Sequence, residues 1–435
     1  MATATTIPLT AGATVPGPEA TRAARLDALA ALDAAGWPTR RREQWRYTDL
    51  EPLAADNFEL ASDPADEATL ETVRRRLAEP AFGDASRRLV LVDGQRVAGL
   101  GATALEGIEI AAPEERWNEF VRLFATPIAA TQYPLATLNT AFGRHGLWLK
   151  LRAGSHLDAP IHLVVVGSRS QLATQPRIVI EAEPGSRATF VQHFIDCVDD
   201  GQGDKAQGWT NCVTQLRQSE GSRIALYRVQ RHGSDAVHTS LLAAELAPRA
   251  ELIAGYFDLG ARLVRNDIAI TLAGADARTD VFGLLLAGAG QHVDDHTLIR
   301  HAAGATVSSE NFRGIIGGRG RGVFNGKVVV DPGCQRIDAR QNNDNLLLGD
   351  HAEIDAKPEF EIYANDVKCS HGSTVGELDA EQLFYLRARG LDAVSARRLL
   401  TIAFATAIVE QIADERLRAE TMALVTARLA TLAEQ

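Results

Sequence analysis

A turn followed by a short strand recurs through the middle of this sequence. Each copy contains glycine or proline, then small and polar residues, then alternating apolar and polar residues. The turns align at positions 185, 221, 249, 274, 304, 333 and 349, so successive copies are 36, 28, 25, 30, 29 and 16 residues apart. The alternation predicts strands with one buried face. A loosely constant spacing of this size is typical of repeat proteins, in which each unit buries its apolar face against the next.

The connections between these strands narrow the choice of fold. No helical pattern of about 10–15 residues separates them, which argues against a sheet built from β-α-β units. An antiparallel sandwich would also have short strands, but it would not need the same turn chemistry at a recurring interval. We therefore predict a mainly β fold with a parallel β-helix as its core.

Helical periodicity is confined to the two ends of the chain. Apolar residues at helical spacing, with capping residues such as Asp379 and Gly390, mark the predicted helices. These helices cover 19–36, 66–78, 381–389, 392–417 and 420–432. We divide the chain into an N-terminal helical region with a frayed leader (1–145), the β-helix core (146–376) and a C-terminal helical region (377–435).

The charge balance excludes a general nucleic-acid-binding role. The 435 residues include 45 lysines and arginines against 56 aspartates and glutamates, a formal net charge of -11, whereas attraction to phosphates requires excess positive charge. Arginines and aromatic residues are interleaved over Arg40–Leu50, but we interpret this segment as rings that pack beneath arginine stems. We predict no nucleic acid as a partner.

Cysteine usage and hydropathy predict a cytoplasmic protein without a membrane anchor. The four cysteines are too few and too scattered for a disulfide framework. The longest apolar runs fall far short of the roughly 20 residues needed to cross a bilayer, and the N-terminus does not resemble a secretory signal. We expect Cys197, Cys212 and Cys334 to pack as small apolar residues.

The motifs of common enzyme classes are missing or incomplete. Gly320–Lys327 resembles a phosphate-binding loop, but Val328 replaces the serine or threonine that would hold magnesium. We interpret it as a glycine-rich turn before a strand, and we predict no bound nucleotide. No G-x-S-x-G motif is present to supply a hydrolase nucleophile. No catalytic residue is predicted.

Two clusters have residue types that bind metals. His292 and His296 share one face of a strand or helix, and His301 follows; solvated acids in a turn are the competing interpretation. Cys369 and His371 are two residues apart, so an extended backbone points both the same way. A thiolate beside an imidazole suits zinc or iron or a Cys/His nucleophile pair, and Lys368 would favour the thiolate. Two ligands are only half of a tetrahedral site, and a buried cysteine beside a hydrogen-bonded histidine is the competing interpretation.

Longer strings of residues point to one family. They are densest from Phe312 onward, and they resemble the SufB/SufD family of iron–sulfur cluster assembly proteins. The strings are Glu43–Thr48, Phe324–Val328, Ala339–Asn343, Asn345–Gly349, Ala356–Pro358, Glu361–Gly372 and Gln382–Gly390.

The resemblance implies a fold, partners and a site. The family fold is a right-handed parallel β-helix flanked by helical regions. The implied complex contains SufB, which would pair through the end of the β-helix, and the ATPase SufC, which would bind the C-terminal helices. A transient iron–sulfur cluster or iron would be shared with SufB, and His371, more strongly than Cys369, is its implied ligand here. The candidate docking residues are Leu383, Phe384, Leu386, Leu399, Ile402 and Phe404.

One departure places the chain within the family. The resemblance implies that SufB has a sulfur-accepting cysteine at a position where this sequence has Asn343. The chain therefore resembles the SufD side of the family. The implied role is that of a non-catalytic scaffold, with ATP hydrolysis left to SufC. Two other functions stay open: a β-helix enzyme acting on acidic polysaccharide, and a stand-alone zinc protein using the group from His292 to His301. The sequence also leaves open whether the isolated chain forms a homodimer.

Overall fold

The computed structural model describes residues 15–17, 19–51, 53, 56, 58–61, 64–112, 130–197 and 207–433. The predicted frayed leader, up to residue 14, lies outside the described residues. The fold is mainly β, with a parallel solenoid of about eight coils flanked by helices at both ends. The predicted fold class is therefore confirmed.

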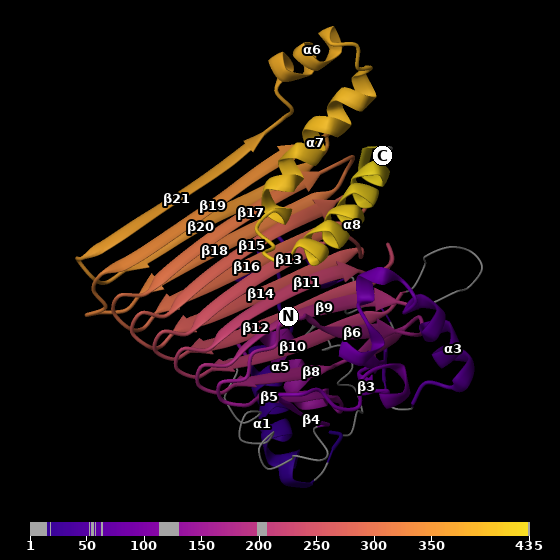
Figure 1. Ribbon diagram of the computed structural model, residues 1–435, viewed down its shortest axis with the longest axis vertical. Coiled ribbons are helices and arrows are strands. Elements are labelled where there is room, and N and C mark those ends of the chain that lie inside the picture. The colour runs from indigo at the N-terminus through magenta and orange to yellow at the C-terminus, as the bar shows by residue number, and fades with distance from the viewer. Residues whose placement is uncertain are drawn as a thin grey trace, which may run out of the picture.

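Each coil of the β-helix contributes one strand to each of two parallel sheets (Figure 1). The first sheet runs from β4 at the N-terminal end to β20, and the second runs from β3 to β21. The first sheet contains β4(Ile108–Ala111), β5(Gly146–Leu151), β8(Arg177–Ala182), β10(Trp209–Gln218), β12(Val237–Leu246), β14(Leu263–Leu272), β16(His292–His301), β18(Arg321–Val330) and β20(Glu353–Ile362), with β1(Glu59–Leu60) and β7(Leu172–Thr174) beside it. The second contains β3(Gln95–Arg96), β2(Arg88–Val92), β6(Ile161–Gly167), β9(Arg187–Asp196), β11(Arg223–Arg231), β13(Glu251–Asp258), β15(Arg278–Ala287), β17(Val307–Ile316), β19(Ile337–Leu347) and β21(Val367–Gly376).

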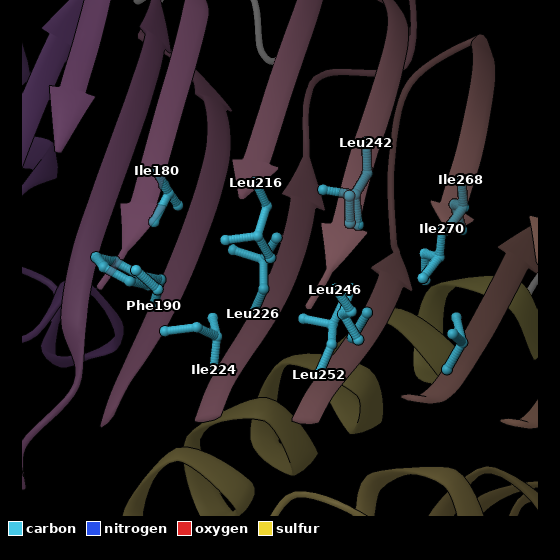
Figure 2. Packing of buried hydrophobic residues seen from close by; sticks show 14 of the residues in the cluster. Ile180, Phe190, Leu216, Ile224, Leu226, Leu242, Leu246, Leu252, Ile268 and Ile270 are labelled. Carbon is cyan, nitrogen blue, oxygen red and sulfur yellow. The ribbon is translucent and has the colours of Figure 1, made fainter. Parts of the chain in front are cut away.

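Alternate residues of the long strands point into the space between the two sheets. Leucine, isoleucine, valine and phenylalanine fill most of this interior, and equivalent positions of successive coils stack on one another because the strands pair in register. Figure 2 shows this packing, with Ile180, Leu216 and Leu242 from the first sheet and Phe190 and Leu252 from the second. Coil upon coil, the interior forms one continuous core.

The recurring turns of the sequence occupy the corners of the coils. The turns at 185, 221, 249, 274, 304 and 333 all lead from the first sheet to the second. The turn at 349 is different, because it leads back from β19 to β20 at the opposite corner. Its short spacing of 16 residues is therefore about half a coil. The segment Gly320–Lys327 was predicted to be a turn, and this is wrong, because β18 begins at Arg321.

The N-terminal region contains helices, as predicted, and it also adds strands to the ends of both sheets. β2 pairs in parallel with β6, and β4 pairs antiparallel with β5. Trp37 and Trp45 are buried with Trp209 in one cluster beneath the N-terminal helices, which confirms that the rings of Arg40–Leu50 pack. The helical elements here are α1(Glu19–Ala35), η1(Glu43–Trp45), α3(Glu67–Arg76), η2(Pro80–Phe82), η3(Ala85–Arg87), η4(Ala98–Leu100) and α5(Pro134–Phe142).

Three helices follow the β-helix: α6(Ala380–Ala388), α7(Ala393–Val409) and α8(Glu415–Ala433). Asp379 accepts hydrogen bonds from the backbone N–H groups at 381 and 382, and Gly390 has the positive φ of a residue that ends a helix. The predicted continuation of the second helix to Leu417 is wrong. The chain turns after Val409, and Asp414 caps α8 through the N–H of Leu417.

Much of the apolar surface of α7 and α8 covers the β-helix itself. Ile408 and Leu429 are buried with Phe257, Phe282 and Leu284 on the outer face of the second sheet. By contrast, α6 stands clear of the sheets, beyond the end where β21 lies (Figure 1). No helix within the described part of the chain is both long enough and apolar enough to span a membrane.

Candidate functional site

The C-terminal end of the β-helix is open. β20 and β21 are the last strands of their sheets, and none of their residues is buried. In β18 and β19, one coil further in, buried residues alternate with half-buried or exposed ones. The outer edge of such a strand presents N–H and C=O groups that can pair with another chain. This end of the β-helix therefore offers free strand edges with which another chain can pair.

Cys369 and His371 lie on this last coil and face the same way. Cys369 is half-buried against the interior core, together with Phe360 from the opposite sheet. The ring of His371 is exposed, and its centroid lies 4.9 Å from that of Phe360. The structure thus brings the thiol and the imidazole together at the open end, as their two-residue spacing predicts.

The thiol of Cys369 is not activated by its neighbour. Burial raises the pKa of Cys369, with Asp338 adding to the effect and a backbone hydrogen bond at Ala339 opposing it. Lys368 is an exposed residue on the alternate face of the strand. The expectation that Lys368 favours the thiolate is therefore wrong. In the chain alone, the exposed imidazole of His371 is the more available ligand.

Two residues that the sequence did not single out lie behind His371. The strand register places Gln341 beside His371 and Glu310 beside Gln341, one coil deeper each time. Gln341 donates a hydrogen bond from Nε2 to Oε1 of Glu310 at 3.2 Å, and Thr297 donates to the other carboxylate oxygen. The signal that could have found them is their spacing from His371, one coil for Gln341 and two coils for Glu310, which becomes visible only when the register is known.

The carboxyl group of Glu310 should make stability depend on pH. Burial raises its pKa to about 7, although the hydrogen bonds from Thr297 and Gln341 oppose the rise. Because the folded pKa lies above the unfolded one, its contribution to stability is full below about pH 4.3 and is lost as the pH rises through 7. We expect the free energy of unfolding of the parent, relative to a Glu310→Gln variant, to fall by about 2–3 kcal/mol between pH 5 and pH 8.

Denaturant unfolding of both chains at the two pH values measures this difference. Glu353→Gln is the control, because it makes the same change in a glutamate whose side chain is 65% exposed. A pH dependence that is identical in the parent and the Glu310→Gln chain would contradict the assignment.

Asn343 stands at the position where the resemblance places a cysteine in SufB. It is buried in β19, where its amide contacts that of Asn345 and the backbone carbonyl oxygen of Phe312. Its register partner on the last coil is Ser373. At this position the interior thus holds an amide in place of a thiol.

The histidines of the alternative metal cluster are used for other contacts. His292 Nε2 lies 2.8 Å from the Thr48 hydroxyl, and His296 Nε2 lies 2.9 Å from Oδ1 of Asp294, both on the outer face of β16. His301 points to the opposite face, where it contacts Thr306 and Ser308. Among the described residues, no three His, Cys, Asp or Glu side chains are placed to hold a metal ion.

This outer cluster instead ties the N-terminal segment to the β-helix. Arg265 is buried, and it pairs with Asp294 at 2.7 Å and with Asp267 at 2.8 Å. Its guanidinium lies over the ring of Trp45, 4.3 Å from the centroid, and donates to the carbonyl oxygen of Gln44. Burial opposes the charge of Asp294, but Arg265 and then His296 outweigh it and hold the pKa of Asp294 well below its usual range.

The predicted docking residues divide into two groups. Phe384 and Leu399 are exposed, at 74% and 47%, and Leu383 and Leu386 are half-buried on α6. Phe384 and Leu386 line an open groove with Tyr385 and Leu400. The remaining two, Ile402 and Phe404, pack against the β-helix, where the guanidinium of Arg313 lies 4.5 Å from the ring of Phe404.

The other cysteines lie where the sequence predicts. Cys212 and Cys334 are buried in the interior core, and Cys197 is buried in a cluster beneath α3. Burial raises the pKa of the Cys212 thiol to about 11. The prediction that these three cysteines pack as small apolar residues is confirmed.

The comparisons with known proteins all point to the same family. Residues 164–404 match the model of the SufBD core domain, described as "SUF system FeS cluster assembly". The iron–sulfur cluster assembly protein SufD of Escherichia coli (strain K12) is 30% identical over 400 residues, which are 91% of this chain and 90% of that protein. An iron–sulfur cluster assembly SufBD family protein of Synechocystis is 30% identical over 86% of this chain and 84% of its own length. The chloroplastic protein ABCI7 of Arabidopsis thaliana is 25% identical over 88% of this chain and 80% of its own length.

Proposed function

Because the chain belongs to the SufB/SufD family of SUF-system iron–sulfur cluster assembly proteins, we propose that it is a non-catalytic scaffold subunit of a complex with SufB and SufC. The observation that carries this proposal is the open last coil, which presents Cys369 and His371 beside unpaired strand edges. A scaffold of this kind holds a cluster while it is built and makes no covalent change to a substrate of its own.

The last coil is the proposed place of pairing with SufB. Strand edges of two β-helices can continue one another by backbone hydrogen bonds. Iron or the nascent cluster is the cargo of this junction. An imidazole and a thiol make up only half of a tetrahedral set, so SufB would supply the other ligands. His371 is the principal ligand in this proposal, since its imidazole is exposed while Cys369 is half-buried.

The α6 surface is the proposed place for the ATPase SufC. This surface consists of Leu383, Phe384 and Leu386 of α6 together with Leu399 of α7. Phe384 and Leu399 expose apolar area that no part of the described chain covers, and the half-buried Leu383 and Leu386 extend it. Ile402 and Phe404 do not belong to this surface, because they are used within the chain. In this arrangement SufC alone binds and hydrolyses ATP.

A Phe384→Glu variant is expected to lose SufC while its fold is retained. The side chain is 74% exposed, so the change should leave stability nearly unaltered, but it places a charge in the middle of the proposed contact. Affinity capture of SufC from co-expressing cells measures the loss, which we expect to exceed about tenfold. Leu26→Glu is the matched control, because Leu26 is an exposed apolar residue of α1 in the N-terminal region. Equal capture by both variants would move the docking site away from α6.

Purification from the native cell tests the scaffold role as a whole. The proposal expects SufB and SufC to co-purify with the tagged chain in fixed proportion. A chain that purifies without either protein and cleaves acidic polysaccharide would overturn it in favour of the β-helix enzyme. A stoichiometric zinc content in the purified monomer would favour the zinc protein instead.

A further inference from the structure

One column of interior residues changes character towards the open end of the β-helix. Side chains at equivalent positions of successive coils stack because the strands pair in register. The first members of this column in the second sheet are apolar and the last three are polar. In order from β11 to β21 they are Leu226, Ala254, Val281, Glu310, Gln341 and His371.

Glu310 is the fixed inner end of the polar part. It is 2% exposed and accepts hydrogen bonds on both carboxylate oxygens, from the hydroxyl of Thr297 and from Nε2 of Gln341. In its ionised form the carboxylate can only accept hydrogen bonds, so that form selects the NH₂ side of the amide that faces it. The carbonyl side of Gln341 must therefore face away from Glu310.

Gln341 is held in this orientation and has one atom unused. Gly326 on the opposite sheet makes room for it, since a Cβ at that position would lie 2.2 Å from Nε2 of Gln341. Oε1 of Gln341 is buried and has no hydrogen-bond partner among the described residues. Buried polar atoms without partners are rare in folded proteins, and each one points to a contact still to be made.

The next group along the column is the imidazole of His371. Neighbouring strands lie about 4.8 Å apart, so an amide and an imidazole at register positions on one face are within reach of a hydrogen bond. A histidine that binds a metal with one ring nitrogen almost always donates the N–H of the other to an oxygen. Gln341 offers an oxygen of this kind, unused and with its orientation fixed.

We propose that Gln341 is a positioning residue that accepts the ring N–H of His371, and that Glu310 fixes the amide for this task. The hydrogen bond selects one tautomer of the imidazole and leaves the lone pair of the other ring nitrogen free for iron. This inference rests on the proposed role of His371 as an iron ligand. The chain Thr297–Glu310–Gln341–His371 then connects the buried interior to the cargo.

Two variants test the proposal in the full chain bound to its partners. Gln341→Met removes the acceptor at nearly constant size, and Glu310→Gln lets the Gln341 amide turn its NH₂ group towards His371. Both should weaken Fe(II) binding by about 10- to 100-fold. In the full chain without metal, both should also shift the ¹⁵N signals of the His371 imidazole from one tautomer to a mixture. Asn343→Leu is the matched control, because Asn343 is a buried amide of the same strand in a column that ends at Ser373.

The outcomes separate this inference from the proposed function. Unchanged Fe(II) binding in a His371→Ala chain would reject the ligand role itself. Loss of binding in that chain, with Gln341→Met and Glu310→Gln behaving as Asn343→Leu in both measurements, would reject the positioning role alone. Failure of both variants to fold, seen as the loss of a cooperative unfolding transition, would also reject it, because the two residues would then be structural.

Discussion

A His371→Ala chain is expected to assemble with SufB and SufC and to yield no iron–sulfur cluster. The side chain is exposed on the last coil and contacts only the ring of Phe360 among the described aromatic residues, so its removal should cost little stability. It takes away the most available ligand of the proposed junction. The measurement is the iron and sulfide content of the complex purified from cells, together with its visible absorption.

His351→Ala is the matched control for this experiment. His351 is also an exposed histidine near the open end, but it lies in the turn between β19 and β20 and not on the inward face of β21. We expect its cluster content to equal that of the parent. Normal cluster formation in the His371→Ala complex would remove His371 from the site, whatever the fate of the family assignment.

An Arg265→Met chain should lose about 3–5 kcal/mol of its free energy of unfolding, because the change leaves two partly or fully buried carboxylates without their cation. The side chains of Arg265 and Asp294 are each 1% exposed, and Asp267 is 10% exposed. The loss should shrink as the pH falls, since protonation of Asp294, which has then lost Arg265, relieves its buried charge. Denaturant unfolding at pH 7 and pH 4 measures both effects.

The control for this experiment is an ion pair that is exposed to solvent. Arg300 pairs with Asp331 at 2.9 Å, but its side chain is 56% exposed, so Arg300→Met should cost no more than about 1 kcal/mol. Equal losses for the two arginines would show that the link between the N-terminal segment and β16 contributes little to stability.

The coil was predictable from the sequence because its signals are local. Turn residues and alternation lie within a few positions of each other, and so do the helix caps Asp379 and Gly390. The turn at 349 misled the alignment because the two corners of a coil use similar residues. The strands β2 and β4 were not predicted because they are short and pair with strands about 40 or more residues away.

The site was only half predictable for the same reason. Cys369 and His371 share a strand, so their spacing alone shows that they point the same way. Glu310 and Gln341 join them through register between coils of unequal length, and no pattern in one sequence gives that register. The pKa of Cys369 could not be foreseen either, because burial decides it and the adjacent lysine does not.

The two ends of the β-helix finish in different kinds of strand, and this difference should decide where the free chain opens locally. At the N-terminal end the sheets finish in the antiparallel strands β3 and β4, whereas at the other end they finish in parallel strands with no buried residue. In a solenoid each coil is stabilised mainly by its neighbours, so local opening starts where a neighbour is missing. Deuterium would therefore exchange first into the backbone amides of β21 and then into those of each coil further in. A subunit bound to the last coil would slow exchange in all of them.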